Sequence, residues 1–407
     1  MMIQNKTSRA FNLAVANFIV TLVFGFVSAA TALPPQLANY DPSGQIRFKT
    51  LAQAENKRQE LIRYIWPTGL PTNTLPAVNR NIGLDVFSNA LSGLDHSLAA
   101  SVDLLDSEIV PYQFHGLSYL IHPAAKSTNN LRLVVINSGH RNGVAFAYGV
   151  NHVADRLLGE GFNVLMTDMP LVGFNTWHTI ALPNGASTVN IAGRETTGHN
   201  EMFAKLIPAL PAGTIFRFFL EPMVQGVNYF LHTTPGAADV SYVGLSGGGW
   251  TGHMLAALDV RIKRSFPVAG SLPLYARSFS PGSEGDAEQI YAPLYLEVDR
   301  HNTNGVPDTA AGVASWLEIY ALGGIGPGRH QTQILNLYDA CCFSGDTFQT
   351  YTNFVSTTVR ELGRGSWDFY SDATHKEHQI SSNCLKNVIL LGLMGTPGKP
   401  ESSRLGP

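Results

Sequence analysis

The sequence has few charged residues and no concentration of positive charge. Only 14% of its 407 residues are Asp, Glu, Lys or Arg, and the formal net charge is -3. No lysine and arginine run stands out, so we expect no nucleic-acid partner. No internal repeat is visible, which argues against a solenoid or a propeller. The chain is 44% hydrophobic, which is ample for one large buried core or two ordinary ones.

Runs of apolar residues that approach the length of a membrane span are confined to the N-terminus. Residues 1–10 carry Lys6 and Arg9 without an acid, residues 11–32 are mostly apolar, and Ala30-Thr31-Ala32 offers a small-residue cleavage site. This layout is typical of a secretory signal peptide, so we expect residues 1–32 to be removed. An uncleaved membrane anchor is the alternative. With cleavage, the mature chain is secreted or periplasmic and is not stably inserted in a membrane.

Cysteine is scarce, with only Cys341, Cys342 and Cys384 in the whole chain. In an oxidising compartment two of the three are expected to form a disulfide, which leaves one thiol over. All three pairings are open, including the bond between the adjacent Cys341 and Cys342. We favour a bond from Cys384 to Cys341 or Cys342.

The distribution of proline and of the predicted elements suggests how the chain is divided into segments. Residues 33–95 are proline-rich with one predicted helix over 47–66, and we expect them to form an N-terminal extension packed on the core. Residues 96–395 form the main predicted domain, within which 171–235 is a probable cap. The tail, residues 396–407, is expected to be flexible.

Apolar strand-like runs alternate with helix-like runs through the main domain. Strands are predicted at 101–105, 115–123, 131–140, 162–170, 238–246, 264–272, 331–339 and 366–372, and helices at 145–161, 218–234, 248–263 and 380–395. This alternation predicts an α/β fold with a mostly parallel sheet covered by helices on both faces. In such sheets, the functional residues gather beyond the carboxyl ends of the strands.

One strand end carries a serine among four glycines. Gly244-Leu245-Ser246-Gly247-Gly248 matches the G-x-S-x-G pattern, in which a sharp strand-to-helix turn exposes a serine hydroxyl. A Cβ at either flanking glycine would clash in so tight a turn. The segment lacks the G-K-[ST] ending of a phosphate-binding loop and the G-x-G-x-x-G spacing of a dinucleotide site, although a plain tight turn remains the alternative. We therefore expect Ser246 to be a nucleophile.

With this motif in its strand and helix context, the chain resembles the α/β-hydrolase fold superfamily over roughly residues 97–395. The resemblance implies a triad in the chain order nucleophile, acid, histidine. Asp339 follows a predicted strand and His378 follows the last one, so they are the favoured acid and base. A neutral imidazole is needed because a serine hydroxyl is a poor nucleophile, and the carboxylate orients that imidazole.

Both positions have rivals. His375 is the alternative base, although His378 lies directly before the last predicted helix. Asp299, Asp346 and Asp372 are alternative acids. The segment after Asp299 partly resembles a calcium loop, but it lacks the first acid and the distal glutamate, so a turn is the better interpretation.

The resemblance also implies two oxyanion-hole donors. One is the backbone N–H of Gly247, and the other comes from the loop after the predicted strand 131–140, where we favour the N–H of His140. The superfamily often has His-Gly here, whereas this chain has Ser138-Gly139-His140. His178 and Trp250 are the candidate substrate-binding residues, and His199, which lies in the same irregular stretch as His178, could also line the substrate cleft.

These features predict a secreted serine hydrolase that needs no cofactor and no metal. A small-molecule or carbohydrate-linked ester is the expected substrate. A serine peptidase of the same fold is one alternative, although no propeller-like repeats are present to filter peptides. A catalytically silent binding protein is the other, and it is disfavoured because all three triad positions are filled.

Overall fold

A computed structural model describes residues 33–140, 143, 149–183, 187–237, 239–280, 282–295 and 312–395. The predicted signal peptide, the C-terminal tail and the segment around Asp299 lie outside these residues. Among the described residues, no helix is long and apolar enough to cross a membrane.

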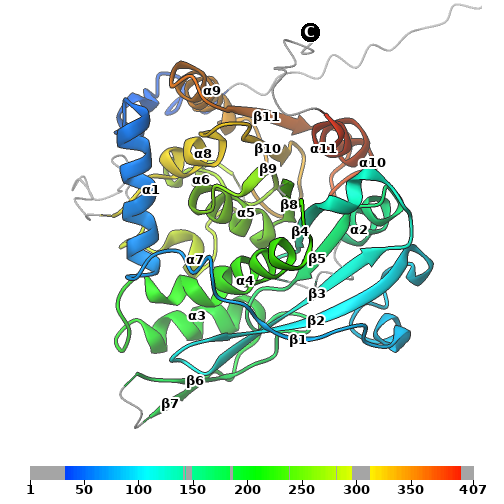
Figure 1. The fold of residues 1–407 in the computed structure, drawn as a ribbon. Coiled ribbons are helices and arrows are strands. Elements are labelled where there is room, and N and C mark those ends of the chain that lie inside the picture. Colours follow the sequence, from blue (N-terminus) through cyan, green and yellow to red (C-terminus); the bar gives the residue numbers. More distant parts are fainter. Residues whose placement is uncertain are drawn as a thin grey trace, which may run out of the picture. The chain divides into compact units, whose positions relative to one another are not determined.

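A mixed sheet of nine strands organises the described residues (Figure 1). In sheet order the strands are β1 (Ala77–Asn79), β2 (Ala99–Ile109), β3 (Phe114–Pro123), β5 (Asn163–Thr167), β4 (Arg132–Asn137), β8 (Asp239–Leu245), β9 (Ile262–Val268), β10 (His330–Asn336) and β11 (Ser366–Asp372). The strands from β5 to β11 in this order pair in parallel, whereas β1, β2 and β3 pair antiparallel. The predicted mostly parallel sheet is confirmed.

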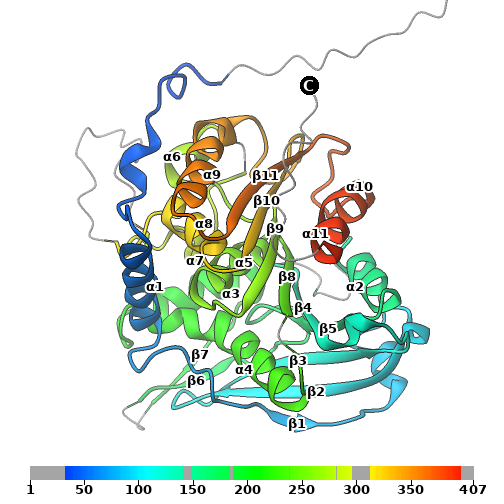
Figure 2. The ribbon, with the colours of Figure 1, turned by 45° about the horizontal axis from the view of Figure 1, so that its top comes forward.

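Helices cover both faces of this sheet (Figure 2). The helices on one face are α1 (Leu51–Ile65), α4 (Arg217–Thr233), α5 (Gly247–Leu258), α8 (Trp316–Gly324) and α9 (Thr352–Glu361). The helices on the other face are α2 (Val150–Gly159), α10 (Ser382–Cys384) and α11 (Leu390–Met394). Strand β4 shows why both faces need cover, because Leu133 and Val135 enter one core while Val134 and Ile136 enter the other.

The residues before the sheet contribute to the first of these cores. Thr50 caps α1 by accepting a hydrogen bond from the N–H of Gln53, and the helix buries Leu61 and Ile65. Trp66 follows the helix and donates its indole N–H to Glu221 in α4 over 3.0 Å. The segment thus packs on α4 and α5, while the proposed domain boundaries stay predictions.

The predicted cap region contains elements of two kinds. A small hairpin, β6 (Thr179–Ala181) with β7 (Thr188–Asn190), and α3 (Glu195–Leu206) precede the long helix α4. Nearly all of α4 is buried against β2 and β3, so this helix covers the sheet.

The sequence placed one helix boundary wrongly, and among the helices of nine residues or more it missed α3, α8 and α9. Helix α3 was missed because its stretch of sequence shows no clear periodicity. The helix after Ser246 ends at Leu258 rather than Lys263, because the chain turns at Asp259 and enters β9 at Ile262. Helix α8 was not predicted because it is apolar on every side and so has no amphipathic period, and α9 is rich in threonine and valine, which are weak helix formers.

Candidate active site

Ser246 occupies the turn between β8 and α5. Its backbone has φ 59° and ψ -124°, a region that non-glycine residues rarely enter. The N–H of Ser246 donates to the carbonyl of Val268 over 2.9 Å, and its carbonyl accepts from the N–H of Trp250 over 2.9 Å. The neighbouring strand β9 and the following helix α5 therefore hold this strained residue in place, and Ser246 is partly exposed.

The flanking glycines are required by close backbone approach. A Cβ at Gly244 would lie 2.3 Å from the carbonyl oxygen of Gly248, and a Cβ at Gly248 would lie 2.2 Å from that of Asn137. Neither contact is possible without movement of the backbone. The glycines around Ser246 are thus explained by the close approach of three backbone segments, which are the end of β8, the start of α5 and the end of β4.

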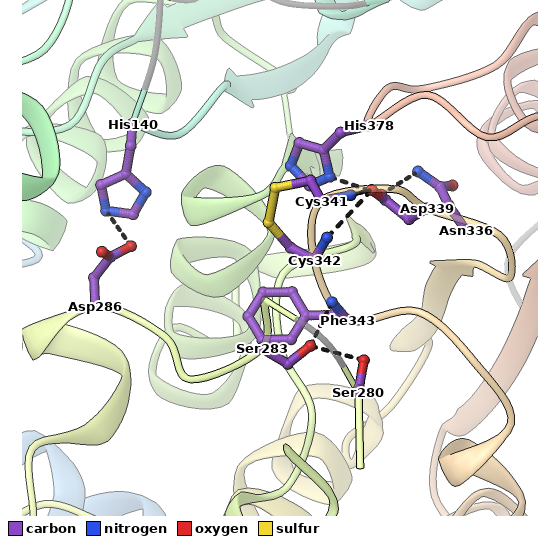
Figure 3. Close-up of a disulfide and its surroundings, with 10 residues drawn as sticks. All are labelled: His140, Ser280, Ser283, Asp286, Asn336, Asp339, Cys341, Cys342, Phe343 and His378. Carbon is purple, nitrogen blue, oxygen red and sulfur yellow. Dashed lines mark hydrogen bonds and ion pairs between the residues drawn. A yellow bond between two sulfur atoms is a disulfide. The ribbon is translucent and has the colours of Figure 1, made fainter. Parts of the chain in front are cut away.

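Asp339 and His378 form a hydrogen-bonded pair in the loops after β10 and β11. Oδ2 of Asp339 lies 2.7 Å from Nδ1 of His378, and Oδ1 accepts from the backbone N–H groups of Cys341 (2.8 Å) and Cys342 (3.3 Å). Burial acts to raise the pKa of Asp339, but these hydrogen bonds and the neighbouring imidazole lower the pKa overall. Asp339 is therefore held as a carboxylate (Figure 3).

The remaining ring nitrogen of His378, Nε2, is buried and has no hydrogen-bond partner among the residues that the structure describes. A carboxylate can only accept, so Nδ1 carries the proton in the neutral ring and Nε2 is left with a lone pair. This is the tautomer that a general base for a serine hydroxyl requires.

Backbone contacts fix the histidine loop against the acid loop. The side chain of Asn336 donates to the carbonyl of Gln379 over 2.9 Å, and the N–H of Ala340 donates to the carbonyl of Lys376 over 2.9 Å. Because β8, β9, β10 and β11 are parallel neighbours, their carboxyl ends lie at one edge of the sheet. That edge carries Ser246 together with both loops.

The rival residues have other contacts. His375 lies 3.5 Å from Asp372, whose carboxylate accepts hydrogen bonds from Thr374 and Ser381. Asp372 thereby braces the loop between β11 and α10. Asp346 occupies the position before a short 3-10 turn over Thr347–Thr350, and Asp299 lies outside the described residues.

The predicted oxyanion loop lies directly against Ser246. Gly139 has φ 130°, and a Cβ there would come 2.8 Å from the backbone nitrogen of Gly247 and 3.0 Å from Cβ of Ser246. The N–H of Gly248 donates to the carbonyl of Ser138 over 3.2 Å, which attaches this loop to the first turn of α5. The structure thus places both predicted donor segments beside Ser246.

The side chain of His140 has a separate environment, which the sequence did not reveal. Its Nε2 lies 2.6 Å from Oε1 of Glu288 and 3.1 Å from Oδ2 of Asp286, and the ring packs on that of His199. Burial acts to lower the pKa of His140, yet the two carboxylates raise the pKa overall. Glu288 lies in the short helix α7 (Ala287–Ile290) and Asp286 is the residue before it. Neither belongs to a motif, so only the tertiary structure shows their proximity to His140.

The predicted substrate-binding residues differ in their accessibility. Trp250 is fully buried and donates its indole N–H to the hydroxyl of Tyr295 over 2.7 Å. Its predicted contact with substrate is wrong, because its ring is enclosed in the core. His178 is half-buried, and its Nδ1 contacts the carbonyl of Ile191 over 2.9 Å at the β6–β7 hairpin. His199 is fully buried beneath the oxyanion loop.

The cysteine pairing favoured from the sequence is also wrong. A disulfide joins the adjacent Cys341 and Cys342, and Cys384 is a free thiol buried under the sheet. Helix α10 places Cys384 in the core formed with α2, whereas the other two cysteines belong to the exposed acid loop. Figure 3 shows the disulfide next to His378 and Asp339.

The order and direction of the strands, with a serine at a strained strand-to-helix turn, define the α/β-hydrolase fold, and solved structures agree. The methylesterase BT1017 matches 82% of this chain with a TM-score of 0.50 at 16% identity, and this chain spans 61% of that protein. A candidate acetyl xylan esterase from Bacteroides fragilis matches 83% of this chain and 79% of its own length, with a TM-score of 0.51 at 12% identity. No family model and no curated protein matches the sequence.

Proposed function

We propose that the protein is a serine hydrolase that cleaves a carboxylic ester through an acyl-enzyme. One observation supports this most strongly: the His378–Asp339 pair leaves Nε2 without a partner at the same sheet edge as the strained Ser246. An imidazole oriented by a carboxylate beside an exposed serine is the arrangement that activates a hydroxyl.

In the proposed first half-reaction, Nε2 of His378 takes the hydroxyl proton as Oγ of Ser246 attacks the ester carbonyl. Asp339 stabilises the imidazolium that forms, and it stays ionised because its pKa is lowered. The imidazolium then donates its proton to the departing alkoxide, which leaves as an alcohol. In the second half-reaction the same ring takes a proton from water as the water oxygen attacks the acyl carbon. The bond from that carbon to Oγ of Ser246 then breaks, the imidazolium returns the proton to Oγ, and the acid product is released.

The negative charge that develops on the carbonyl oxygen requires preorganised donors. The N–H of Gly247 is the first proposed donor and the N–H of His140 is the second. Their support is the close contact of Gly139 with the backbone of Gly247. Since the loop is attached to α5 through Ser138, the two donors are held in place before substrate arrives.

An ester is the proposed substrate for two reasons. The similar structures at a TM-score of 0.50 or more are named as a methylesterase and a candidate acetyl xylan esterase. The 407 residues also contain no propeller-like repeats of the kind that select peptides. A small or carbohydrate-linked ester is therefore preferred over a peptide amide, and export by residues 1–32 belongs to the same proposal.

Labelling with a fluorophosphonate tests the nucleophile directly. Wild-type protein should react with one fluorophosphonate per chain at Ser246, and the Ser246→Ala variant should not react. The control is Ser241→Ala, which changes a buried serine of β8 on the same strand. Folded wild-type protein that stays unlabelled would favour the silent binding protein.

A substrate panel then separates the two hydrolytic functions. Acetylated sugars, methyl esters and short aryl esters should be cleaved with rates that fall about 10⁴-fold or more in Ser246→Ala. Peptide amides should be cleaved more slowly than every reactive ester. Faster cleavage of the amides would make the protein a peptidase.

A further inference from the structure

A second cluster of ionisable side chains lies beneath the oxyanion loop. It brings together His140 after β4, His199 of α3, and Asp286 and Glu288 at α7. His199 and Glu288 are fully buried, His140 is 9% exposed, and the side chain of Asp286 is 22% exposed. So many charged or chargeable groups are rarely buried together without a compensating partner.

Two atoms of this cluster have no hydrogen-bond partner within the described part of the chain. They are Nδ1 of His199 and Oε2 of Glu288, both in side chains that are fully buried. A buried polar atom without a partner is costly, which suggests that a group is missing from the cluster.

The tautomer of His199 indicates what kind of group this is. Its Nε2 lies 2.6 Å from the carbonyl oxygen of Pro170, which only accepts, so Nε2 carries a proton. In the neutral ring Nδ1 is then a lone pair, and it faces Oε1 of Glu288 at 3.5 Å. Two electron-pair donors that face each other need a proton or a cation between them.

We propose that His140, His199, Asp286 and Glu288 bind a divalent zinc ion. The ligand atoms are Nε2 of His140, Nδ1 of His199 and one carboxylate oxygen from each acid. Adjacent ligand atoms in a tetrahedral zinc site lie about 3.3 Å apart when each is about 2.0 Å from the metal. Nε2 of His140 lies 2.6 Å from Oε1 of Glu288 and 3.1 Å from Oδ2 of Asp286, and Nδ1 of His199 lies 3.5 Å from Oε1 of Glu288. The ligand atoms of His140, His199 and Glu288 all lie within 4.8 Å of one another, so these three form the core of the site and a movement of the Asp286 side chain would supply the fourth ligand.

The chemistry of the four ligands also favours zinc over harder cations. Two imidazoles with two carboxylates suit zinc, whereas calcium and magnesium prefer oxygen ligands alone. The charges of the two carboxylates balance that of the metal, which makes the buried site neutral. The hydrogen bond from His199 to Pro170 is the outer contact that commonly orients a ligating histidine.

A metal in this site would have a structural effect on the sheet edge that carries Ser246. The ring of His140 also contacts Gly247, since a Cβ at Gly247 would lie 2.9 Å from its Cε1 atom. A metal bound at Nε2, a ring atom bonded to Cε1, would fix the oxyanion loop to α3 and α7. The zinc site does not depend on the proposed esterase activity, and metal binding can be measured without a substrate.

The experiment measures metal in the full chain, purified in non-reducing buffer without a metal-binding tag. Elemental analysis of wild-type protein should find about one zinc ion per chain, and protein stripped with a chelator should regain zinc in a calorimetric titration with zinc chloride. His199→Gln and Glu288→Gln should each weaken zinc binding by about 100-fold or more, because each removes a ligand.

Two controls keep the result specific. His253→Gln changes another fully buried histidine outside the cluster and should bind zinc like wild type. The only other group of potential metal ligands in the described residues is Cys341, Cys342 and His378. The double variant Cys341→Ser with Cys342→Ser disrupts that group and should bind zinc like wild type. Circular dichroism shows which variants fold. A stripped wild-type protein that takes up no zinc would overturn the proposal. So would folded His199→Gln and Glu288→Gln variants that bind zinc as tightly as the wild type does.

Discussion

Nδ1 of His378 lies 2.7 Å from Oδ2 of Asp339, although the two residues follow different strands. The pairing arises because β10 and β11 run in parallel and end at the same edge of the sheet. It also distinguishes His378 from His375, which is three residues away and lies near another acid.

Replacement of either histidine tests this distinction. His378→Asn should lower kcat for a reactive ester by about 10⁴-fold or more, because no group is left to take the serine proton. His375→Asn should change kcat by less than about tenfold, because His375 lies near Asp372 instead. Steady-state kinetics of both variants provides the measurement, and the reverse order would assign the base to His375.

The acid can be tested in the same way. Asp339→Asn should lower kcat by about 10⁴-fold, because an amide no longer favours the tautomer with a free Nε2. Asp372→Asn is the matched change. It should lower the melting temperature but leave kcat largely unchanged, because Asp372 braces its loop through Thr374 and Ser381. A folded Asp372→Asn enzyme as inactive as Asp339→Asn would contradict the assignment.

The glycine nest makes a prediction about stability. Gly248→Ala should destabilise the protein by roughly 1–3 kcal/mol or more and abolish activity, because its Cβ would lie 2.2 Å from the carbonyl oxygen of Asn137. Gly159→Ala in α2 is the control, since its Cβ would meet nothing within 4 Å and alanine favours helix. Denaturant unfolding of both variants, with circular dichroism, measures the difference.

The pH dependence of stability should reflect His253. Burial lowers the pKa of this ring to about 3, partly offset by a hydrogen bond with Gln331, whereas the unfolded chain has a histidine pKa of about 6.5. Between these values the unfolded state binds a proton that the native state does not. Its contribution to stability is therefore complete above about pH 6.5 and is lost as the pH falls, by up to about 1.4 kcal/mol per pH unit.

His253→Gln removes this contribution and should flatten the decline in unfolding free energy between about pH 6 and pH 4. Urea unfolding of the variant and of wild type across that range compares the two slopes. Parallel slopes would show that the ring does not resist protonation in the native state.

The cysteine arrangement can be checked chemically. Peptide mapping without reductant should find Cys341 and Cys342 joined within one peptide, and the denatured protein should show a single reactive thiol at Cys384. Burial raises the pKa of the Cys384 thiol, so this thiol should react only after unfolding. A crosslink between Cys384 and the acid loop would restore the pairing favoured by the sequence.

The sequence by itself was sufficient for the features that depend on neighbouring residues. Alternation of apolar runs predicted the parallel strands, and the glycines around Ser246 predicted a strained turn, because both follow from local periodicity and backbone sterics. Similar local reasoning misplaced the end of α5, since the turn at Asp259 depends on where β9 joins the sheet.

Only the tertiary structure decided which distant side chains meet. Trp250 looked available to substrate but is enclosed by residues from α4 and from the segment around Tyr295. Cys384 faces the core, so it cannot reach the acid loop that holds the other cysteines. The cluster around Glu288 joins three segments that have no shared motif. Such contacts depend on how helices and loops pack over the sheet, which composition and spacing do not encode.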